Sequence, residues 1–376
     1  MDLFRFNNPN ELTRMEDGIF LNNLKSAMWI ERYQAAGEFK LIGYASDEIQ
    51  QLLPRGSFIS HIDTQEIMIV ENHELKESPG KESLVTVTGR SLESYLENRV
   101  CGRNGVLGEI GYICEANYSW AQAVELITAH ILPGYPIDYG DLLSYFEVLN
   151  VVDDTSVWTP RYIERGVLYT RLLELLAVDN LGIKTVRPGP YSPAVDQTNT
   201  TLVIHKGIDR SGEVVLSNES GEIESADYLW SIKNLKNCAF VSGKWISTFV
   251  DNDGPATGYN RRILFVDAND IDNSYNSAPT ELDAANVTSA MEVRGREALA
   301  AHQEIALANI QVSKSSKNNR FRQFYEVGDL ITVRGSYNET QTLRVTEYVE
   351  IDDEKGNVGY PTLSNPYHPP PEGEAM

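Results

Sequence analysis

The residues of this chain that come closest to a recognised metal-binding spacing lie between positions 270 and 281. Asp270, Asp272, Ser274 and Glu281 match positions one, three, five and twelve of a calcium-binding loop, whose oxygen ligands suit Ca²⁺. Position six of that loop needs Gly for a sharp turn, but Tyr275 stands there, and no convincing helix precedes the segment. We therefore interpret it as a solvated acidic loop and expect no bound metal.

Residues suited to catalysis are scattered rather than grouped. The six histidines, at positions 61, 73, 130, 205, 302 and 368, form neither a His-x-x-x-His nor a His-Glu-x-x-His arrangement. The sequence has no Gly-x-Ser-x-Gly elbow, no phosphate-binding loop and no Gly-x-Gly-x-x-Gly after a strand. Carboxylates are so abundant that a glycosidase pair cannot be selected without geometry. The sequence therefore predicts no catalytic residue, no cofactor and no enzyme activity.

The chain is strongly acidic. Its 376 residues include 54 Asp and Glu against 32 Lys and Arg, which leaves a net charge of −22 at pH 7. Because affinity for nucleic acid depends largely on cations that displace counterions, sequence-specific binding of DNA or RNA is disfavoured. The charge also opposes adsorption to an anionic membrane, and no stretch of about 18 uncharged apolar residues is available to span one.

The start of the chain and its cysteines indicate the cellular compartment in which it is made. The first eleven residues lack the basic and then apolar regions of a secretory signal, so we expect synthesis in the cytoplasm. Cys101, Cys114 and Cys238 form no Cys-x-x-Cys pair, and their odd number fits neither a disulfide framework nor a zinc site. We expect buried free thiols.

The elements that would position functional residues begin with β structure. Residues 26–33 read as a strand with side chains suited to burial on both faces, and 38–42 as its hairpin partner after a turn in which Gly37 can adopt a positive φ. Three further strands are expected at 57–62, 67–75 and 84–88. Five short strands at this spacing predict a small barrel or sandwich.

The middle of the chain has mixed patterns. Ser119 and Gln122 have the form of a capping box that opens a helix ending before Pro133, and a second helix is predicted over 167–178, ended by Asn180 or Gly182. Strands are expected at 201–205, 214–216, 228–233, 239–250 and 263–266. A capping box at Ser289 and Glu292 predicts a helix of about twenty residues whose apolar stripe runs from Met291 to Ile310.

The last part of the chain returns to β structure. Strands are expected at 321–326, 330–333, 340–351 and 358–363, with Val327, Gly328 and Asp329 turning between the first two. The tail contains four prolines, and we expect it to be extended or disordered; the alternative is a docking peptide for a partner.

A basic segment interrupts the acidic chain near residues 305–325. Lys314, Lys317, Arg320 and Arg322 lie there with no acid between them. Such a run is typical of a solvated face, and the alternative is a contact through which copies of the chain associate with an acidic neighbour.

Both ends of the chain resemble a known family. The segments WIERY at 29–33, GEF at 37–39, IMIVE at 67–71 and VTGRSL at 87–92, followed near the C-terminus by YEVGDLITV at 325–333 and RVTE at 344–347, resemble siphophage tail-hub proteins in the same order. These are baseplate or tail-tip proteins of long-tailed bacteriophages and are similar to the central hub of contractile tails. The middle, at about 100–300, matches in pattern alone.

The resemblance implies a fold that is mainly β with an α+β middle: two small β-barrel domains at the termini, with mixed α/β domains inserted between them. It implies a first β-barrel domain at 1–98, an α/β domain at 99–195, a β-rich domain ending in a long helix at 196–310, a second β-barrel domain at 311–364 and a Pro-rich tail at 365–376. Packing and interface roles are expected for Trp29, Arg32, Tyr33, Gly37 and Phe39 in the first barrel and for Gly328 and Asp329 in the turn of the second.

The function implied by the resemblance is structural. A homotrimeric hub would join a sixfold tail tube to a threefold tip in the virion and form part of the DNA-ejection channel. The implied partners are distal tail and tail-tube proteins, a tape-measure protein, tip spike or fibre proteins, and viral DNA in transit. Two alternatives stay open: a virion-associated cell-wall hydrolase using carboxylates of the middle domains, and a receptor- or carbohydrate-binding module using aromatic residues of 228–250, Trp245 among them.

Overall fold

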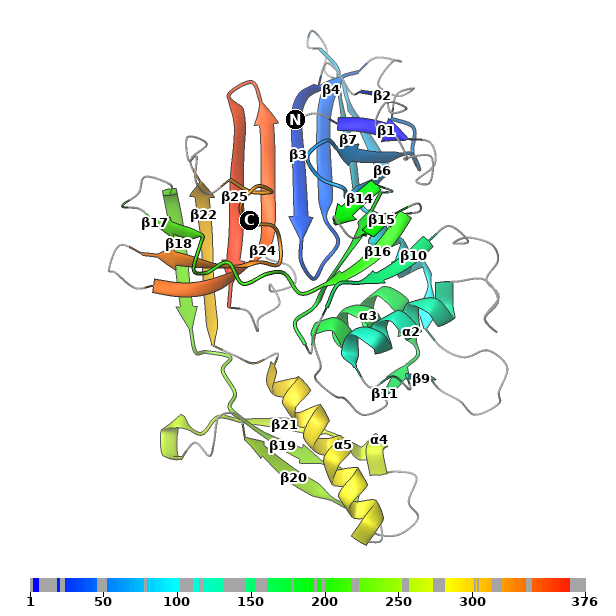
Figure 1. The fold of residues 1–376 in the computed structure, drawn as a ribbon, viewed down its shortest axis with the longest axis vertical. Helices are drawn as coiled ribbons and strands as arrows, with labels where there is room; N and C mark the ends of the chain where they lie inside the picture. The colour runs from blue at the N-terminus through cyan, green and yellow to red at the C-terminus, as the bar shows by residue number, and fades with distance from the viewer. Residues whose placement is uncertain are drawn as a thin grey trace. The chain divides into compact units, whose positions relative to one another are not determined.

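The fold is taken from a computed structural model of the chain (Figure 1). The structure describes residues 3–6, 19–20, 24–45, 53–77, 80, 82–101, 111–114, 116, 118–131, 146–152, 161–177, 179–187, 189–192, 195–197, 200–217, 219, 223–251, 257–272, 281–300, 302, 304–312, 320–335 and 340–365. Strands predominate among these residues, which confirms a mainly β protein. None of the described helices combines the length and hydropathy needed to cross a membrane.

The chain divides into two compact units. Unit 1 comprises Met1–Ala226 and Asn309–Leu363, and unit 2 comprises Asp227–Ala308 and Ser364–Met376. Because unit 1 combines an N-terminal segment with a segment near the C-terminus, contacts between residues some three hundred positions apart decide its structure. The finer division into five parts stays a prediction.

The largest sheet joins strands from the two ends of the chain. Its order is β18-β22-β25-β24-β3-β4-β7-β6-β5-β1-β2, and β23 pairs with both β24 and β17. The strands are β1 (Leu3–Phe6), β2 (Ile19–Phe20), β3 (Leu24–Arg32), β4 (Glu38–Tyr44), β5 (Phe58–His61), β6 (Ile67–Lys76), β7 (Leu84–Ser91), β17 (Val215–Ser217), β18 (Ile223–Ser231), β22 (Ile305–Val312), β23 (Leu330–Arg334), β24 (Thr340–Asp353) and β25 (Gly356–Ser364).

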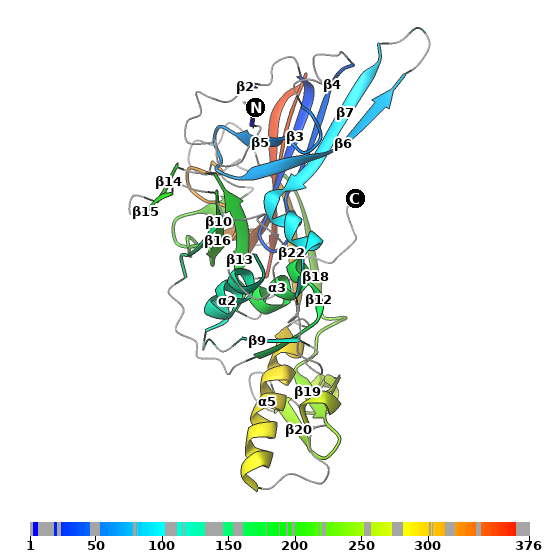
Figure 2. The same cartoon turned by 90° about the vertical axis from the view of Figure 1, so that its right-hand side faces the viewer.

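Strand β3 connects the N-terminal and C-terminal parts of this sheet. It pairs antiparallel with β4 on one side and with β24 on the other, so that Trp29 lies opposite both Phe39 and Glu350. The described strands form no closed barrel, and the expected pair of separate terminal barrels is not confirmed, because hydrogen bonds between β3 and β24 make the two modules parts of one sheet. Figure 2 shows β6 and β7 running together as a long antiparallel pair within the same sheet.

The inner face of this sheet carries an apolar core. Side chains alternate along β3, β4 and β7, and the inward set is buried while the outward set is half-exposed. The inward residues include Ala27, Trp29, Phe39, Leu41, Met68, Val70, Val85 and Val87. The five N-terminal strands expected from sequence are thus present.

The α/β part of unit 1 is built on a second core. Helices α2 (Ser119–Ile131) and α3 (Leu168–Ala177) pack with a sheet of order β10-β16-β13, and Leu168, Leu172, Leu175 and Leu176 of α3 are buried. Cys101 and Cys114 lie in this core, and with Cys238 they are free and buried, as predicted. The remaining elements are β8 (Val100–Cys101), β9 (Gly111–Cys114), β10 (Phe146–Asn150), β11 (Arg161–Glu164), β12 (Gly166–Val167), β13 (Gly182–Val186), β14 (Gly189–Ser192), β15 (Val195–Gln197), β16 (Thr200–His205) and the 3-10 helix Leu92–Asn98.

The ends of these two helices differ in how well they were predicted. Asn180 ends α3 with a φ of 55°, the left-handed conformation expected there. The capping box of α2 is not formed as expected: the Ser119 hydroxyl donates to Asp179, and the Gln122 amide donates to the carbonyl of Ala116 at 2.8 Å. Both polar groups are used to fix neighbouring loops instead.

Unit 2 contains a three-stranded sheet covered by a long helix. The sheet has the order β20-β19-β21, with β19 (Cys238–Ser242), β20 (Ser247–Asp251) and β21 (Ile263–Asp267), and Figure 1 shows α5 (Glu281–Ala300) lying across it. The predicted strand 239–250 is thus a hairpin. Two short helices, the 3-10 helix Gly258–Asn260 and α4 (Asn269–Asp272), complete the unit.

The long helix lies earlier in the sequence than predicted. It begins at Glu281 and ends at Ala300, so Ser289 is an exposed residue inside it and not a cap. Residues Ile305 to Val312 form β22, where Ala308, Ile310 and Val312 are buried with a period of two. The predicted strand 321–326 is also wrong, because Phe321 and Tyr325 make only an isolated bridge.

Candidate functional site

The candidate site is a junction at which three parts of unit 1 meet around β3. The N-terminal hairpin supplies Tyr33, the α/β part supplies the segment 180–210, and the C-terminal part supplies the turn before β23. We call this the Tyr33 junction, defined by Tyr33, Gly182, His205, Gly328 and Arg344. A second group, the Arg322 cluster, lies beside it and is defined by Glu31, His61, Glu66, Arg322 and Glu350.

Trp29 and Phe39 form the base of the hairpin that carries Tyr33. They are opposite each other on β3 and β4, their ring centroids are 6.4 Å apart, and both are fully buried. Trp29 also lies 6.1 Å from the ring of His61. Both rings belong to the apolar core of the large sheet.

Gly37 is needed for a close approach rather than for a positive φ. It is absent from the positive-φ residues, which corrects the expectation from sequence. A Cβ at Gly37 would lie 2.5 Å from the carbonyl oxygen of Ile30. Its N–H donates to the Ser91 hydroxyl at 2.7 Å, and its carbonyl accepts from the Ser91 N–H at 2.9 Å. The turn is thereby joined to the end of β7.

Arg32 links β3 to both neighbouring strands. Its guanidinium donates to Glu347 on β24 at 2.6 Å and to the carbonyl of Ala36 at 2.9 Å, and it pairs with Glu38 on β4 at 2.9 Å. Burial alone would lower the pKa of Arg32, but Glu38 and Glu347 raise it. The side chain therefore stays charged and bridges three strands.

Tyr33 makes contacts with every part of the junction. Its N–H donates to the carbonyl of Thr346 at 2.9 Å, and its hydroxyl lies 2.7 Å from the carbonyl oxygen of Asn180 and 3.2 Å from that of His205. The ring packs edge-on against His205 at 5.2 Å, with the Arg344 guanidinium 5.0 Å above it. Burial raises the pKa of Tyr33, so the hydroxyl remains a donor at physiological pH.

Two glycines allow this ring to fit. A Cβ at Gly182 would lie 2.4 Å from the Tyr33 ring, and one at Gly328 would lie 2.7 Å from it. Gly328 also has a φ of 102°, which favours glycine. Its N–H donates to the carbonyl of Val345 at 2.7 Å. The turn predicted at Gly328 thus lies against a residue almost three hundred positions away.

Asp329 fastens the same turn to the α/β part. One carboxylate oxygen accepts from the N–H of Ile208 at 2.7 Å, and the other accepts from Arg210 at 2.9 Å and from the N–H of Glu326 at 3.0 Å. The residue is buried, and its charge is matched by Arg210. Asp329 therefore connects two segments as well as shaping its own turn.

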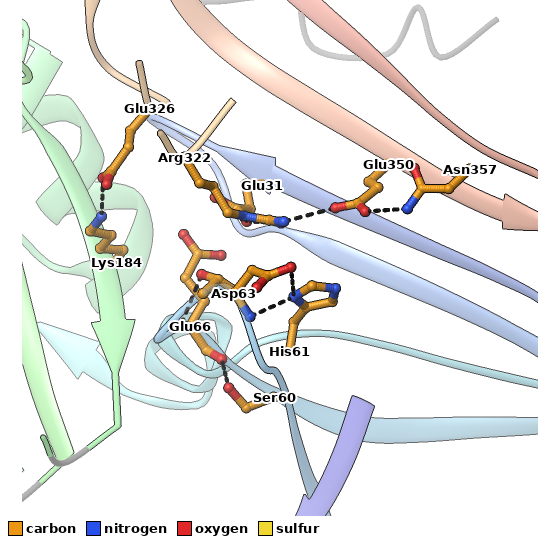
Figure 3. Close-up of polar contacts among 11 residues, drawn as sticks. Glu31, Ser60, His61, Asp63, Glu66, Lys184, Arg322, Glu326, Glu350 and Asn357 are labelled. Carbon is orange, nitrogen blue, oxygen red and sulfur yellow. Dashed lines mark hydrogen bonds and ion pairs between the residues drawn. The ribbon is translucent and has the colours of Figure 1, made fainter. Parts of the chain in front are cut away.

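Figure 3 shows the Arg322 cluster, in which charged groups of three elements are buried together. Arg322 donates to Glu31 on β3 at 2.6 Å and to Glu350 on β24 at 2.8 Å, and Glu350 also accepts from Asn357 on β25 at 2.7 Å. Burial opposes ionisation of Glu350, yet Arg322 and Asn357 lower its pKa. Burial likewise opposes the charge of Arg322, while Glu31 and Glu350 raise its pKa.

Arg322 adopts a φ of 64°, which is uncommon for a residue with a side chain. The interpretation of its basic segment as a solvated face is wrong at this residue, and its acidic partners belong to the same chain. Arg320 is exposed, and Lys314 and Lys317 lie outside the described residues. The sequence held one signal of a buried acidic partner, because strand alternation places Glu31 on the same face of β3 as Trp29 and Tyr33.

Two other titratable members of the Arg322 cluster are His61 and Glu66. Burial, with a smaller contribution from Arg322, lowers the pKa of His61 to about 4, and its Nδ1 accepts from the N–H of Asp63 at 3.0 Å. Burial together with Glu31 and Glu93 raises the pKa of Glu66 well above its usual value. His61 is therefore neutral around neutral pH, and the raised pKa of Glu66 favours its protonated form.

Glu93 ties the cluster to the α/β part. It accepts from the Ser91 hydroxyl and from the N–H of Thr185 at 3.2 Å, and Glu66 forms an isolated bridge with Val186. Burial raises the pKa of Glu93, although these hydrogen bonds lower it. Glu66 and Glu93 are thus packed between the N-terminal strands and β13, and they connect these parts of unit 1.

No group of three metal-ligating side chains occurs within the described ranges. Of the calcium-like spacing, Asp270 and Asp272 lie in α4 and Glu281 begins α5, while Ser274 and Tyr275 lie outside the described residues. The arrangement of Tyr33, Asp329 and Arg322 connects segments and offers no assembled reaction centre of the kinds considered from sequence.

Comparisons with known proteins give one family match and solved structures with a similar fold. The family model described as Siphovirus ReqiPepy6 Gp37-like protein matches residues 17–362, whereas curated proteins give no match. Three solved structures share the fold. They are the 43 kDa tail protein of prophage MuSo2 from Shewanella oneidensis (12% identity, 98% of both chains covered, TM-score 0.59), the tail protein from Neisseria meningitidis MC58 (11%, 98% of this chain and 99% of the other, 0.55) and the prophage tail protein gp18 from Listeria monocytogenes EGD-e (10%, 97% and 94%, 0.53).

These likenesses to solved structures concern the fold, while the family match covers most of the chain. The resemblance to phage tail proteins inferred from the terminal motifs is confirmed. The chain therefore belongs to the Siphovirus ReqiPepy6 Gp37-like family and shares its fold with the three phage tail proteins named above.

Proposed function

We propose that this chain is the homotrimeric hub of a siphophage tail tip, in which three copies join a sixfold tail tube to a threefold tip. The observation that carries the proposal is the pairing of β3 with β24, which sets the first and last β modules side by side within one chain. Three such pairs arranged around an axis supply six β modules. Closure of a ring from identical copies then requires heterologous contacts between neighbours.

A surface suited to such contacts lies on the outward face of the same strands. Antiparallel register places Met28 opposite Ile351, Ile30 opposite Val349, and Ser26 opposite Ile42. Met28, Ile42, Val349 and Ile351 are half-buried within a single chain. An apolar stripe that crosses three strands at their outward face is typical of a surface buried by association.

The remaining roles follow from the same assembly. The hub would contact distal tail and tail-tube proteins on one side and tip spike or fibre proteins on the other, with a tape-measure protein and then viral DNA passing through the ring. The net charge of −22 supports passage without adhesion, since an acidic bore repels the phosphate backbone. Synthesis in the host cytoplasm precedes assembly into the virion.

Variants of the outward stripe test this function. Ile351→Glu places a charge at the centre of the stripe and should abolish completion of tails when the variant replaces the natural protein in infected cells. Leu75→Glu is the matched control, because Leu75 is 47% exposed and lies on the opposite face of the sheet. Normal tails with Ile351→Glu, in a chain shown to be folded, would contradict the proposed contact.

The hydrolase alternative is not favoured by the geometry. Among the described carboxylates, Glu66 and Glu93 have the raised pKa expected of a general acid, but both are buried inside unit 1. A polysaccharide could not reach them without unfolding the junction. Lysis of host peptidoglycan by the purified chain would overturn this view.

The carbohydrate-binding alternative has one supporting observation. Tyr228 and Trp230 stack at 5.5 Å, and Trp230 and Trp245 are exposed. Flat aromatic surfaces suit sugar rings as well as protein partners. Glycan binding that is lost with Trp245→Ala would support this second role, which is compatible with a hub.

A further inference from the structure

The sheet of unit 2 has one covered face and one open face. Ala239, Val241 and Val250 point toward α5 and pack with Met291 and Leu299. Strand alternation directs Phe240, Phe249 and Phe265 to the opposite face. One side of a three-stranded sheet is therefore core, and the other side is aromatic.

The open face is unusually apolar for a surface. Phe249 and Phe265 both lie opposite Phe240 in register, with ring centroids 4.8 and 6.3 Å from it, and they are 52% and 67% exposed. Ile263 adds to the same face. Isolated exposed apolar residues are ordinary, but a contiguous group across three strands indicates a surface that another segment covers.

We propose that the Pro-rich tail of the same chain, residues 366–376, covers this aromatic face. The tail holds Pro366, Pro369, Pro370 and Pro371, and such sequences favour the polyproline II conformation. Extended Pro-rich peptides dock on aromatic surfaces at low entropic cost because they are already ordered.

The tail starts close enough to reach the face. The Asn365 amide donates to the carbonyl of Glu304 at 3.4 Å, and the N–H of Lys236 donates to the carbonyl of His302 at 2.8 Å. Tracing from Asn365 through Glu304 and Lys236 to Phe240 crosses six residue steps and two hydrogen-bonded links, a separation of at most roughly 37 Å at about 3.5 Å per step with the atoms of both links included. The eleven residues that follow Asn365 span about 34 Å as polyproline II, which is comparable with this upper limit.

Charge favours the same occupant. The tail carries Glu372 and Glu374 and no Lys or Arg. Arg261 lies over the ring of Phe249 at 5.3 Å and pairs with Asp251 at 3.8 Å, and it contributes a positive charge beside the open face. Attachment through Asn365 also makes docking intramolecular, which gives the tail an effective concentration in the millimolar range.

The test is hydroxyl-radical footprinting of the full chain beside a chain that ends at Ser364, with oxidation of Phe249 and Phe265 read by mass spectrometry. We expect both residues to be oxidised at least threefold faster in the shortened chain. Tyr44, an exposed residue of unit 1, serves as the internal reference and should keep its rate. Equal rates of Phe249 and Phe265 oxidation in the two chains would overturn the proposal.

Two additional arms identify the occupant. A full-length chain with Pro369→Ser, Pro370→Ser and Pro371→Ser keeps the length and charge of the tail, and it should be oxidised like the shortened chain. Protection in the natural chain should not change on tenfold dilution, because the contact is intramolecular. Protection that disappears on dilution would assign the face to a second copy of the chain and overturn the assignment to the tail. Full protection in the triple variant would also overturn the assignment to the tail.

Discussion

The ring of Tyr33 packs against Gly328, where a Cβ would lie 2.7 Å from the nearest ring carbon. The two residues are almost three hundred positions apart, and their contact joins the first hairpin of the chain to the turn before β23. The contact therefore couples two segments that are remote in sequence, and a substitution at Gly328 tests it.

Gly328→Ala should destabilise unit 1 by about 2–4 kcal/mol. The new methyl group would collide with Tyr33, and the φ of 102° is unfavourable for alanine. Denaturant unfolding followed by circular dichroism measures the change. Gly212→Ala is the matched control, since a Cβ there meets nothing within 4 Å, and it should change stability by less than about 0.5 kcal/mol. Equal effects of the two substitutions would contradict the close packing.

Tyr33→Phe should cost about 1–3 kcal/mol. The substitution keeps the ring but removes the hydroxyl that serves the buried carbonyls of Asn180 and His205. Tyr44→Phe, at an exposed tyrosine of β4, provides the control and should be nearly neutral. An unchanged unfolding free energy for Tyr33→Phe would show that solvent replaces the hydroxyl.

Arg322→Met should destabilise the chain by about 3–5 kcal/mol, because Glu31 and Glu350 would remain buried without their cation. Adding Glu31→Gln and Glu350→Gln to this variant removes the uncompensated charges and should restore much of the loss. The comparison of the single and triple variants by denaturant unfolding separates charge from packing. A triple variant as unstable as the single one would argue against an electrostatic cause.

His61 should make stability depend on pH between about 6.5 and 4. Its folded pKa of about 4 lies below the unfolded value near 6.5, so in this window the unfolded chain binds a proton that the folded chain does not. Stability from this residue is therefore present above pH 6.5 and lost on acidification, by an amount on the order of 3 kcal/mol.

The measurement is the unfolding free energy of the natural chain and of His61→Asn at pH 7 and pH 4.5. Asparagine offers an acceptor in place of Nδ1, so the N–H of Asp63 keeps its partner. The natural chain should lose more stability than the variant over this interval. Parallel losses in the two chains would assign the pH dependence to other groups, such as Glu350, whose lowered pKa also withdraws stability on acidification.

Local pattern accounts for the parts of the fold that were predicted correctly. The alternation in β3 and β4 and the leucines of α3 report directly which side chains are buried. The β22 strand was misassigned to a helix because Ile305, Ala306 and Ile310 continue the apolar spacing of the helix that precedes them. The sheet, and not the local sequence, decides their conformation.

The junction was beyond prediction from local pattern. Trp29, Tyr33, Gly37 and Gly328 could be named from their resemblance to a family, but their partners could not. Arg322 looks like part of a basic surface run, and only its contacts with Glu31 and Glu350, on strands remote from it in sequence, show that it is buried. Such pairings are set by the tertiary fold, which no short segment specifies.

The most direct test of the central proposal is the native mass of the purified full-length chain. We expect a particle of three copies of the 42.1 kDa chain, converted to single chains by Ile351→Glu and unchanged by Leu75→Glu. A chain that remains single at high concentration and in the presence of its tail-tube partner, or that forms particles of two or four copies, would contradict the trimeric hub.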